Sequence, residues 1–253
     1  MTADTPLRIA MWSGPRNIST AMMRSFENRP DTDVVDEPFY AAYLAQTGLD
    51  HPMREAVLAS QPTDWRAVAD GLTGVAPQGA PVFYQKHMTH HMLPDFDLAW
   101  TAACRNVFLI RHPARVLASY VEKRETVNLA DIGVVRQREL FEREADRLGH
   151  APPVIESADV LRTPRPALQA LCDAIGLPFS ETMLAWPAGR RASDGVWAPA
   201  WYDQVERSTG FQPRPEGPLP DLPDPLRRVA EAAEAHYAAL ARFALPVETR
   251  ALP

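Results

Sequence analysis

Residues 12–20 of this chain read WSGPRNIST, and this stretch is the most informative one for predicting the fold. It follows the apolar run Ile9-Ala10-Met11, so a buried strand over 7–12 is predicted to pass into a helix over 19–28. In α/β folds, the loop between a strand and the following helix leaves the N–H groups of the helix N-terminus free to bind phosphate groups. The stretch therefore predicts an anion-binding loop.

A second stretch of the same kind lies at residues 108–120, which read FLIRHPARVLASY. An apolar strand again leads into a helix, and Pro113 stands near the helix start, where a missing N–H costs little. Hydroxyls and an arginine accompany the backbone donors in both stretches. Two such sites indicate a ligand with anionic groups at both ends.

The composition limits the classes of function. The chain has 253 residues, of which 46% are hydrophobic, and its formal net charge is −6. This acidic balance argues against non-specific nucleic-acid binding, which depends on clustered Lys and Arg. Cys104 and Cys172 both lie in apolar patterns and are expected to be buried thiols. With no signal-peptide pattern and no apolar run of membrane-spanning length, we expect a cytoplasmic protein that does not bind membranes.

Strand and helix patterns alternate along the chain. Strands are expected at 7–12, 32–36, 82–86, 106–110 and 153–157. Such alternation favours an α/β fold with a parallel sheet covered by helices on both faces, a three-layer α/β/α arrangement.

We expect a single domain over residues 1–253. It would carry a helical insertion at about 39–75 and a proline-rich loop at 212–225. An amphipathic helix at 226–243 follows, whose apolar face would serve either the core or a homodimer.

The residues of the first loop have the chemistry for an anion. Gly14 permits a tight turn, Pro15 stiffens it, and Arg16 can place its guanidinium on a phosphate or sulfate oxygen. Ser19 and Thr20 stand in the first helical turn, where hydroxyls and N–H groups face the anion. The Gly-Lys pair of an ATP-binding loop is absent, which argues against an ATPase or an ordinary kinase.

Residues 15–20, PRNIST, resemble the 5′-phosphosulfate loop of sulfotransferases that use 3′-phosphoadenosine 5′-phosphosulfate (PAPS). That loop usually reads Pro-Lys/Arg-Ser-Gly-Thr-Thr. The basic residue and both hydroxyls match, whereas Asn17 and Ile18 replace Ser-Gly. The family has a variant of the P-loop nucleoside-triphosphate-hydrolase fold, and the resemblance implies the same fold here.

Residues 111–119 are similar to the 3′-phosphate motif of the same family, with Arg111, Pro113, Arg115 and Ser119 in register. His112 replaces the usual acidic residue. Residues 154–161 resemble the strand and helix that follow, and 190–197 resemble a late loop that closes over the nucleotide. The resemblance implies that one set of residues binds PAPS: Gly14, Pro15, Arg16, Asn17, Ser19, Thr20, Arg111, Ser119, Arg190 and Arg191.

Two residues are candidates for the base that deprotonates the acceptor. Glu37 ends the second strand, where a glutamate serves as base in bacterial branches of the family. His87 lies in a stretch that resembles the Lys-Thr-His-Leu-Pro segment of cytosolic members, whose histidine is the base. We favour Glu37 and keep His87 and Lys86 in the active site. Arg16 would stabilise the leaving phosphate.

The resemblance thus implies a PAPS-dependent sulfotransferase that acts on a hydroxyl or amine of a small molecule, without a metal. The alternatives are another P-loop transferase, such as a small-molecule kinase, and a nucleotide-binding domain without turnover. Aromatic and histidine side chains in 39–100 and 197–211 are expected to shape the acceptor site. Trp197, Trp201 and Tyr202 fit either such a pocket or ordinary core packing.

Overall fold

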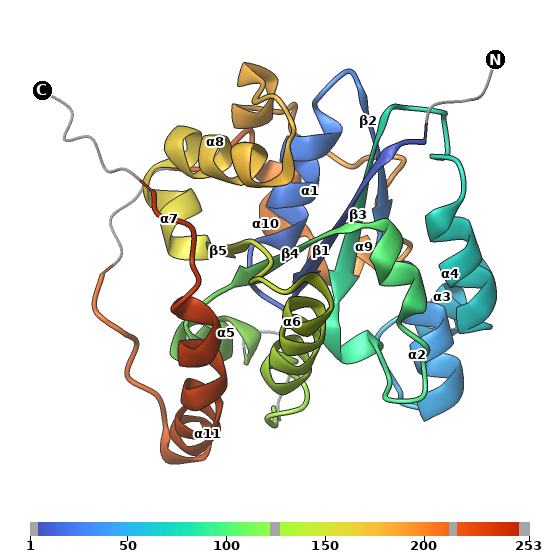
Figure 1. Ribbon diagram of the computed structural model, residues 1–253. Helices are drawn as coiled ribbons and strands as arrows, with labels where there is room; N and C mark the ends of the chain where they lie inside the picture. Colours follow the sequence, from blue (N-terminus) through green and yellow to red (C-terminus); the bar gives the residue numbers. More distant parts are fainter. Residues whose placement is uncertain (1–4, 122–126, 213–216, 248–253) are drawn as a thin grey trace, which may run out of the picture.

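A five-stranded, fully parallel sheet forms the centre of the protein (Figure 1). The computed structural model describes residues 5–121, 127–212 and 217–247. The strand order is β2-β3-β1-β4-β5. The strands are β1 (Leu7–Ser13), β2 (Thr32–Asp36), β3 (Val82–Met88), β4 (Arg105–Ile110) and β5 (Val154–Glu156). The five predicted strands are confirmed, with bounds that agree within two residues.

Helices connect the strands. Those of the first half are α1 (Ser19–Glu27), α2 (Tyr40–Thr47), α3 (Arg54–Ser60), α4 (Trp65–Thr73) and α5 (Pro113–Tyr120). Those of the second half are α6 (Val134–Leu148), α7 (Ser157–Arg162), α8 (Pro164–Ile175), α9 (Ala198–Trp201), α10 (Asp203–Arg207) and α11 (Asp224–Ala241). Short 3₁₀ turns add η1 (Thr89–His91), η2 (Ala99–Ala103) and η3 (Glu181–Leu184). Helices α2, α3 and α4 occupy the segment between β2 and β3.

Three differences from the sequence expectation concern short or proline-containing segments. The sequence pattern did not predict α9 and α10, because helices of four and five residues are too short to show a period. Helix α11 begins at Asp224, inside the expected loop, because prolines in a first helical turn lose no hydrogen bond. Residues 213–216 of that loop lie outside the described residues.

Alternation along the strands places two cores on opposite faces of the sheet. Ile9 and Met11 of β1 pack toward α1 and α8. Ala10 and Trp12 face the other way, toward α4 and α6. Successive side chains of a strand point to opposite faces, so each strand contributes to both cores. The expected three-layer α/β/α fold is therefore confirmed.

Helix α11 packs with its apolar side on the rest of the chain, where Ala233 and Leu240 are fully buried. Directly after it, the backbone N–H of Leu245 donates to the carbonyl of Val154 at 2.8 Å, so the segment runs along the outer edge of β5. A homodimer stays a prediction. Among the helices of the described residues, none combines the length and the apolar character that a membrane crossing requires.

Candidate active site

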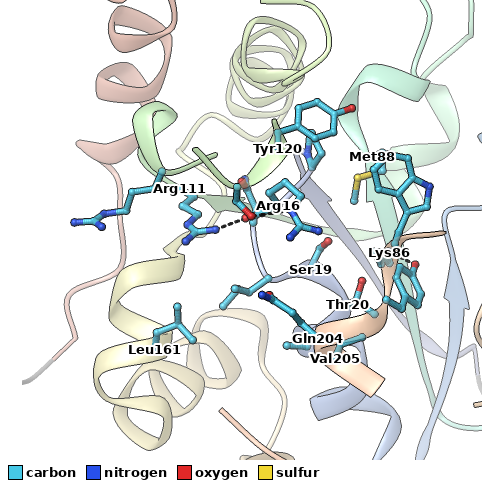
Figure 2. A pocket seen from close by; sticks show the side chains of 18 of the residues that line it. Arg16, Ser19, Thr20, Lys86, Met88, Arg111, Tyr120, Leu161, Gln204 and Val205 are labelled. Carbon is cyan, nitrogen blue, oxygen red and sulfur yellow. Dashed lines mark hydrogen bonds between the residues drawn. The ribbon is translucent and has the colours of Figure 1, made fainter. Parts of the chain in front are cut away.

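A cavity of about 600 Å³ opens at the carboxyl ends of the central strands. Its walls come from the loop after β1, the start of α1, the ends of β2 and β3, helix α5 and helix α10. In Figure 2, Arg16 and Arg111 lie on one side, Lys86 and Met88 on the other, and Ser19 and Thr20 between them. Ligands of open α/β sheets bind at this edge, where strand order reverses, and here the reversal occurs at β1.

The loop after β1 has an unusual backbone. Arg16 and Ile18 adopt left-handed conformations, with φ of 61° and 57°. Ile18 is β-branched, and this conformation costs such residues roughly 1–2 kcal/mol. It stands where the resembling loop has glycine, the residue that adopts this conformation without cost. Strain of this kind persists where surrounding contacts fix the chain, and it collects at binding sites.

Asn17 supplies one of these fixing contacts. Its buried side-chain amide nitrogen donates to the backbone carbonyl of Leu109 at 3.2 Å. The backbone carbonyl of Asn17 accepts from Ser157 Oγ at 3.2 Å. The loop is thereby tied to β4 and to the start of α7. Helix α1 then begins at Ser19, and its N-cap residue Ile18 makes no side-chain hydrogen bond to the helix. The first N–H groups of α1 thus face the cavity without a capping side chain.

The two predicted anion motifs meet in the structure. Arg111 Nη1 donates to the carbonyl of Arg16 at 2.6 Å, and Arg16 Nε donates to Ser119 Oγ at 2.9 Å. Pro15, Asn17, Ser19 and Thr20 line the same cavity as these three residues. His112, which replaces the usual acidic residue, caps α5 by accepting the N–H of Ala114 at 3.2 Å. The second motif therefore keeps its helix cap despite this replacement.

Three residues expected to bind the nucleotide are not among those that line the cavity. A Cβ atom at Gly14 would lie 2.3 Å from the carbonyl oxygen of Ile132, so this glycine serves close packing behind the loop. Arg190 is largely exposed and pairs with Glu206 at 3.4 Å. Arg191 Nε lies 4.0 Å from Glu27. Nucleotide binding by these three residues stays a prediction: in the structure Gly14 is packed against Ile132, and Arg190 and Arg191 lie near the carboxylates of Glu206 and Glu27.

A buried ionic cluster forms the opposite end of the cavity. Lys86 Nζ donates to Asp36 Oδ1 at 2.8 Å, to Glu37 Oε1 at 2.7 Å and to Tyr202 OH at 2.6 Å. Tyr202 OH donates in turn to Asp36 Oδ2 at 2.6 Å and accepts from Trp197 Nε1 at 3.1 Å. Strands β2 and β3 pair in parallel with Asp36 opposite Lys86, which places the two charges side by side.

Burial and charge set the protonation of this cluster. Burial lowers the pKa of Lys86, but the Asp36 and Glu37 carboxylates outweigh it and hold the pKa well above its ordinary 10.5. Burial also raises the pKa of Glu37 above its ordinary 4.5, against the opposing effect of Lys86. Glu37 has a strained φ of 40° and lines the cavity. It is a carboxylate of raised basicity beside a fixed positive charge.

His87 is separated from the cavity. It lies next to Lys86 on β3, so its side chain points to the other face of the sheet. Its ring stacks on Trp12 with centroids 4.5 Å apart, and Nε2 contacts Gln85 Oε1 at 3.2 Å. Burial lowers its pKa to about 3. The structure thus places His87 on the face of the sheet away from Lys86, because adjacent strand residues point to opposite faces, and a role of His87 in the active site stays a prediction that this position does not favour.

Sequence reasoning did not single out two groups that reach the site, although His91 belongs to the histidines of residues 39–100 that were expected to shape it. Asp36 precedes Glu37 and pairs with Lys86, and the alternation of β3 could have identified this partner once β2 was placed beside it. His91, in η1, lines the cavity with its Nδ1 4.0 Å from Glu37 Oε2. The sequence fits either a pocket role or core packing for Tyr202, and in the structure it lines the cavity, contacts Lys86 and packs in a hydrophobic cluster.

Within residues 5–121, 127–212 and 217–247, no three His, Cys, Asp or Glu side chains come together in a way that would hold a metal ion. Arginines, hydroxyls and helix N–H groups are instead the polar groups at the end of the cavity where Arg16 and Arg111 lie. These groups suit an anion directly.

The family model described as "Sulfotransferase domain" matches residues 7–243. The chain belongs to the sulfotransferase family. Two solved sulfotransferases share the fold. One, from Alicyclobacillus acidocaldarius, aligns with a TM-score of 0.56 at 14% identity, over 95% of this chain and 97% of that one. The sulfotransferase domain of the Synechococcus PCC 7002 olefin synthase aligns with a TM-score of 0.51 at 17% identity, over 92% of this chain and 96% of that one.

Two curated plant proteins are similar in sequence to this chain. They are the branched-chain-amino-acid aminotransferase-like proteins 1 and 2 of Arabidopsis thaliana. The first is 36% identical over 208 residues, which are 81% of this chain and 37% of the plant protein. The second is 33% identical over 203 residues, which are 80% of this chain and 36% of the plant protein. The chain thus spans little more than a third of these relatives' length.

Proposed function

We propose that this sulfotransferase transfers the sulfuryl group of PAPS to a hydroxyl or amine of a small molecule. One observation supports this most: a single cavity joins Arg16, Arg111 and Ser119 at one end to Glu37 and Lys86 at the other. Its volume of about 600 Å³ suits a nucleotide with part of an acceptor beside it. Membership of the family agrees with the reaction class.

The donor end fits the two anionic groups of PAPS. The 5′-phosphosulfate would lie at the start of α1, against the helix N–H groups and the hydroxyls of Ser19 and Thr20. Arg111 and Ser119 would hold the 3′-phosphate. Both already contact Arg16, so one connected set of donors serves both anions.

The chemical step is an in-line transfer. A bond forms between the acceptor's oxygen or nitrogen and sulfur, and the bond from sulfur to the 5′-phosphate oxygen breaks. The electron pair stays on the phosphate, where Arg16 and the α1 N–H groups stabilise it. The acceptor's proton passes to Glu37 Oε2, since Oε1 already accepts from Lys86. A positioned base of this kind contributes typically ~10²–10⁴-fold to the rate.

Aromatic and imidazole side chains surround Glu37 on the acceptor side, among them Tyr40, His51, His91 and Trp201. Flat, mostly neutral walls favour a small organic molecule that presents a single hydroxyl or amine. We therefore propose a small-molecule acceptor bound between these walls.

Calorimetric titration tests the proposal. Wild-type protein and Arg111→Ala are titrated with 3′-phosphoadenosine 5′-phosphate (PAP) and, separately, with ATP and Mg²⁺. We expect micromolar binding of PAP, weakened roughly tenfold to a hundredfold in the variant, because a hydrogen bond to a charged group contributes about 1.5–3 kcal/mol. ATP is expected not to bind.

Other results of these titrations would favour one of the alternative functions. Absence of PAP binding would overturn the proposal, and binding of ATP with Mg²⁺ would favour a small-molecule kinase. PAP binding without sulfuryl transfer to any of a broad panel of phenols, alcohols and amines would favour a nucleotide-binding domain without turnover.

A further inference from the structure

The imidazole of His91 is built into the wall beside Glu37. The side chain is 2% exposed and lines the cavity. Its ring stacks on Tyr40 with centroids 4.5 Å apart and on Tyr43 with centroids 4.9 Å apart. Two tyrosines of α2 therefore fix the plane of the ring. A side chain held this firmly presents its nitrogens in defined directions.

One of these nitrogens is unsatisfied in the structure. Nδ1 is fully covered and has no hydrogen-bond partner. Glu37 Oε2 lies 4.0 Å from it, while Oε1 of the same carboxylate accepts from Lys86. A buried polar atom without a partner costs about 1–3 kcal/mol, so natural proteins rarely keep one without a reason. The nearby carboxylate oxygen supplies such a reason.

The surroundings keep this imidazole neutral. The titratable groups around it are His90 of η1, Tyr40 and Tyr43 of α2, His51 after α2, Glu37 after β2 and Lys86 of β3, with His87 acting from the other face of the sheet. Arg136 of α6, which packs against η1, donates instead to the carbonyls of Met92 and Leu93. Burial, followed by the neighbouring histidines and Lys86, lowers the pKa of His91 well below 6.5. A neutral imidazole carries one nitrogen that can accept a hydrogen bond.

We propose that His91 is a positioning residue for the proton transfer, whose Nδ1 accepts a hydrogen bond from Glu37 once Glu37 Oε2 carries the acceptor's proton. This inference rests on the proposed function. The proton leaves the acceptor, bonds to Oε2 and stays on Glu37, so His91 gains no charge. Closing 4.0 Å to a hydrogen bond of ~2.8 Å requires about 1 Å of side-chain movement. Such bonds are often long in ligand-free structures and tighten in the complex.

The consequence is a stronger base. A hydrogen bond to the protonated form of a carboxyl favours that form and raises its pKa. His91 therefore adds to the effect of burial on Glu37, against Lys86, which opposes it. Lys86 holds Oε1 of Glu37, and His91 faces Oε2. A side-chain hydrogen bond with Tyr202 acts in the same direction as Lys86 and lowers the pKa of Glu37.

Three substitutions of His91 separate this role from mere packing. In His91→Asn the short amide can place its oxygen where Nδ1 was, whereas in His91→Gln the amide reaches the position of Nε2. His91→Phe keeps a flat ring for the tyrosines and removes both nitrogens. Circular dichroism and PAP titration establish that each variant is folded and retains the donor site. If His91→Phe does not fold, the Asn and Gln pair decides.

The first readout needs neither donor nor acceptor. Infrared difference spectra of the free protein, recorded as a function of pH, follow the C=O band of protonated Glu37, which Glu37→Gln identifies by its loss. We expect wild type and His91→Asn to titrate together and His91→Gln and His91→Phe to titrate roughly 0.4–1 pH unit lower, the equivalent of one hydrogen bond. Equal midpoints in all four proteins would overturn the inference, and so would an upward shift, because Nδ1 would then donate to the carboxylate.

The second readout is the rate of sulfuryl transfer. We expect kcat to fall roughly 3- to 10-fold in His91→Gln and His91→Phe, with the acid limb of its pH profile moved down, and to stay near wild type in His91→Asn. KM for the donor is expected not to change. If no transfer occurs but the infrared shifts do, the proposed function has failed and the Glu37–His91 contact stands. If transfer proceeds with one common titration midpoint, only this inference has failed.

Discussion

The two ends of the cavity are built on different physical principles. At the donor end, Arg16, Arg111 and Ser119 are half-buried and contact one another through a carbonyl and a hydroxyl. At the acceptor end, Lys86 is 1% exposed and lies between two carboxylates and a tyrosine. Charged groups that contact solvent can exchange one partner for another at low cost. A buried charge that loses its partner is strongly destabilising.

The difference assigns different consequences to change at each end. The donor end can accept an anion by rearranging these half-buried side chains, so substitutions there are expected to alter the affinity for PAP. At the acceptor end the charge of Lys86 is neutralised by the buried carboxylates of Asp36 and Glu37. Substitutions there are therefore expected to alter the rate and the free energy of unfolding. The following predictions test this division, from the largest expected effect to the smallest.

Glu37→Gln is expected to lower the rate of sulfuryl transfer by ~10²–10⁴-fold, because the base is lost, while PAP affinity stays within about twofold. Wild-type activity should fall about tenfold per pH unit below the pKa of Glu37, since only the ionised carboxylate accepts a proton. That pKa is raised, so the midpoint lies above 4.5. Rates measured across pH check this, and an acid limb unchanged in the variant would assign the titration to another group.

Lys86→Met is expected to reduce the free energy of unfolding by about 3–5 kcal/mol, because it leaves two carboxylates buried without their cation. Denaturant unfolding measures the loss. The matched control is Arg66→Met, which removes an exposed pair with Asp64 at 3.7 Å and should change the stability by less than about 1 kcal/mol. Similar losses in both variants would contradict the buried character of the acceptor end.

Gly14→Ala is expected to cost about 1–3 kcal/mol, because the added Cβ would lie 2.3 Å from the Ile132 carbonyl and force the loop or its neighbour to move. Gly71→Ala in α4 is the control, since its Cβ would meet nothing within 4 Å and alanine favours a helix. Thermal unfolding compares the two. Equal stability of both variants would contradict the packing role of Gly14.

Ser119→Ala is expected to weaken PAP binding roughly 2- to 10-fold, because Arg16 Nε loses its 2.9 Å acceptor and is held less firmly. Stability should change little. Arg190→Ala, on a residue outside the cavity that pairs with Glu206, should bind PAP as wild type does. Calorimetry compares the variants, and weaker binding by Arg190→Ala would show that the loop around it reaches the nucleotide.

The difference between the two ends of the cavity also explains which of their residues could be predicted from the sequence. Each donor motif is local: a strand, a turn and the first turn of a helix carry Arg16 or Arg111 within a few residues. Local pattern was therefore enough to predict the parallel sheet and to place both motifs at the carboxyl ends of its strands, where the structure brings them together. The acceptor end joins Lys86 to Asp36 and Tyr202, which are 50 and 116 residues away in the chain. No local pattern carries that information.

The predicted residues that lie away from the cavity have equally simple explanations. A motif resemblance predicts a role for His87, although strand alternation allows only one of Lys86 and His87 to face the cavity. The resemblance also names Arg190 and Arg191, but an arginine in a loop can equally form an ion pair, as these do with Glu206 and Glu27. Gly14 is predicted to permit a tight turn, and the space beside its Cα is filled by the carbonyl of Ile132.

The segment that follows α11 has a consequence for the solution behaviour of the protein. By accepting the N–H of Leu245, Val154 presents the rim of β5 to its own chain rather than to other molecules. An uncovered sheet rim is a template on which further copies can add strands, the first step toward insoluble aggregates. Residues 244 and 245 pair with the start of β5 and are therefore expected to hinder such addition, apart from any chemistry in the cavity.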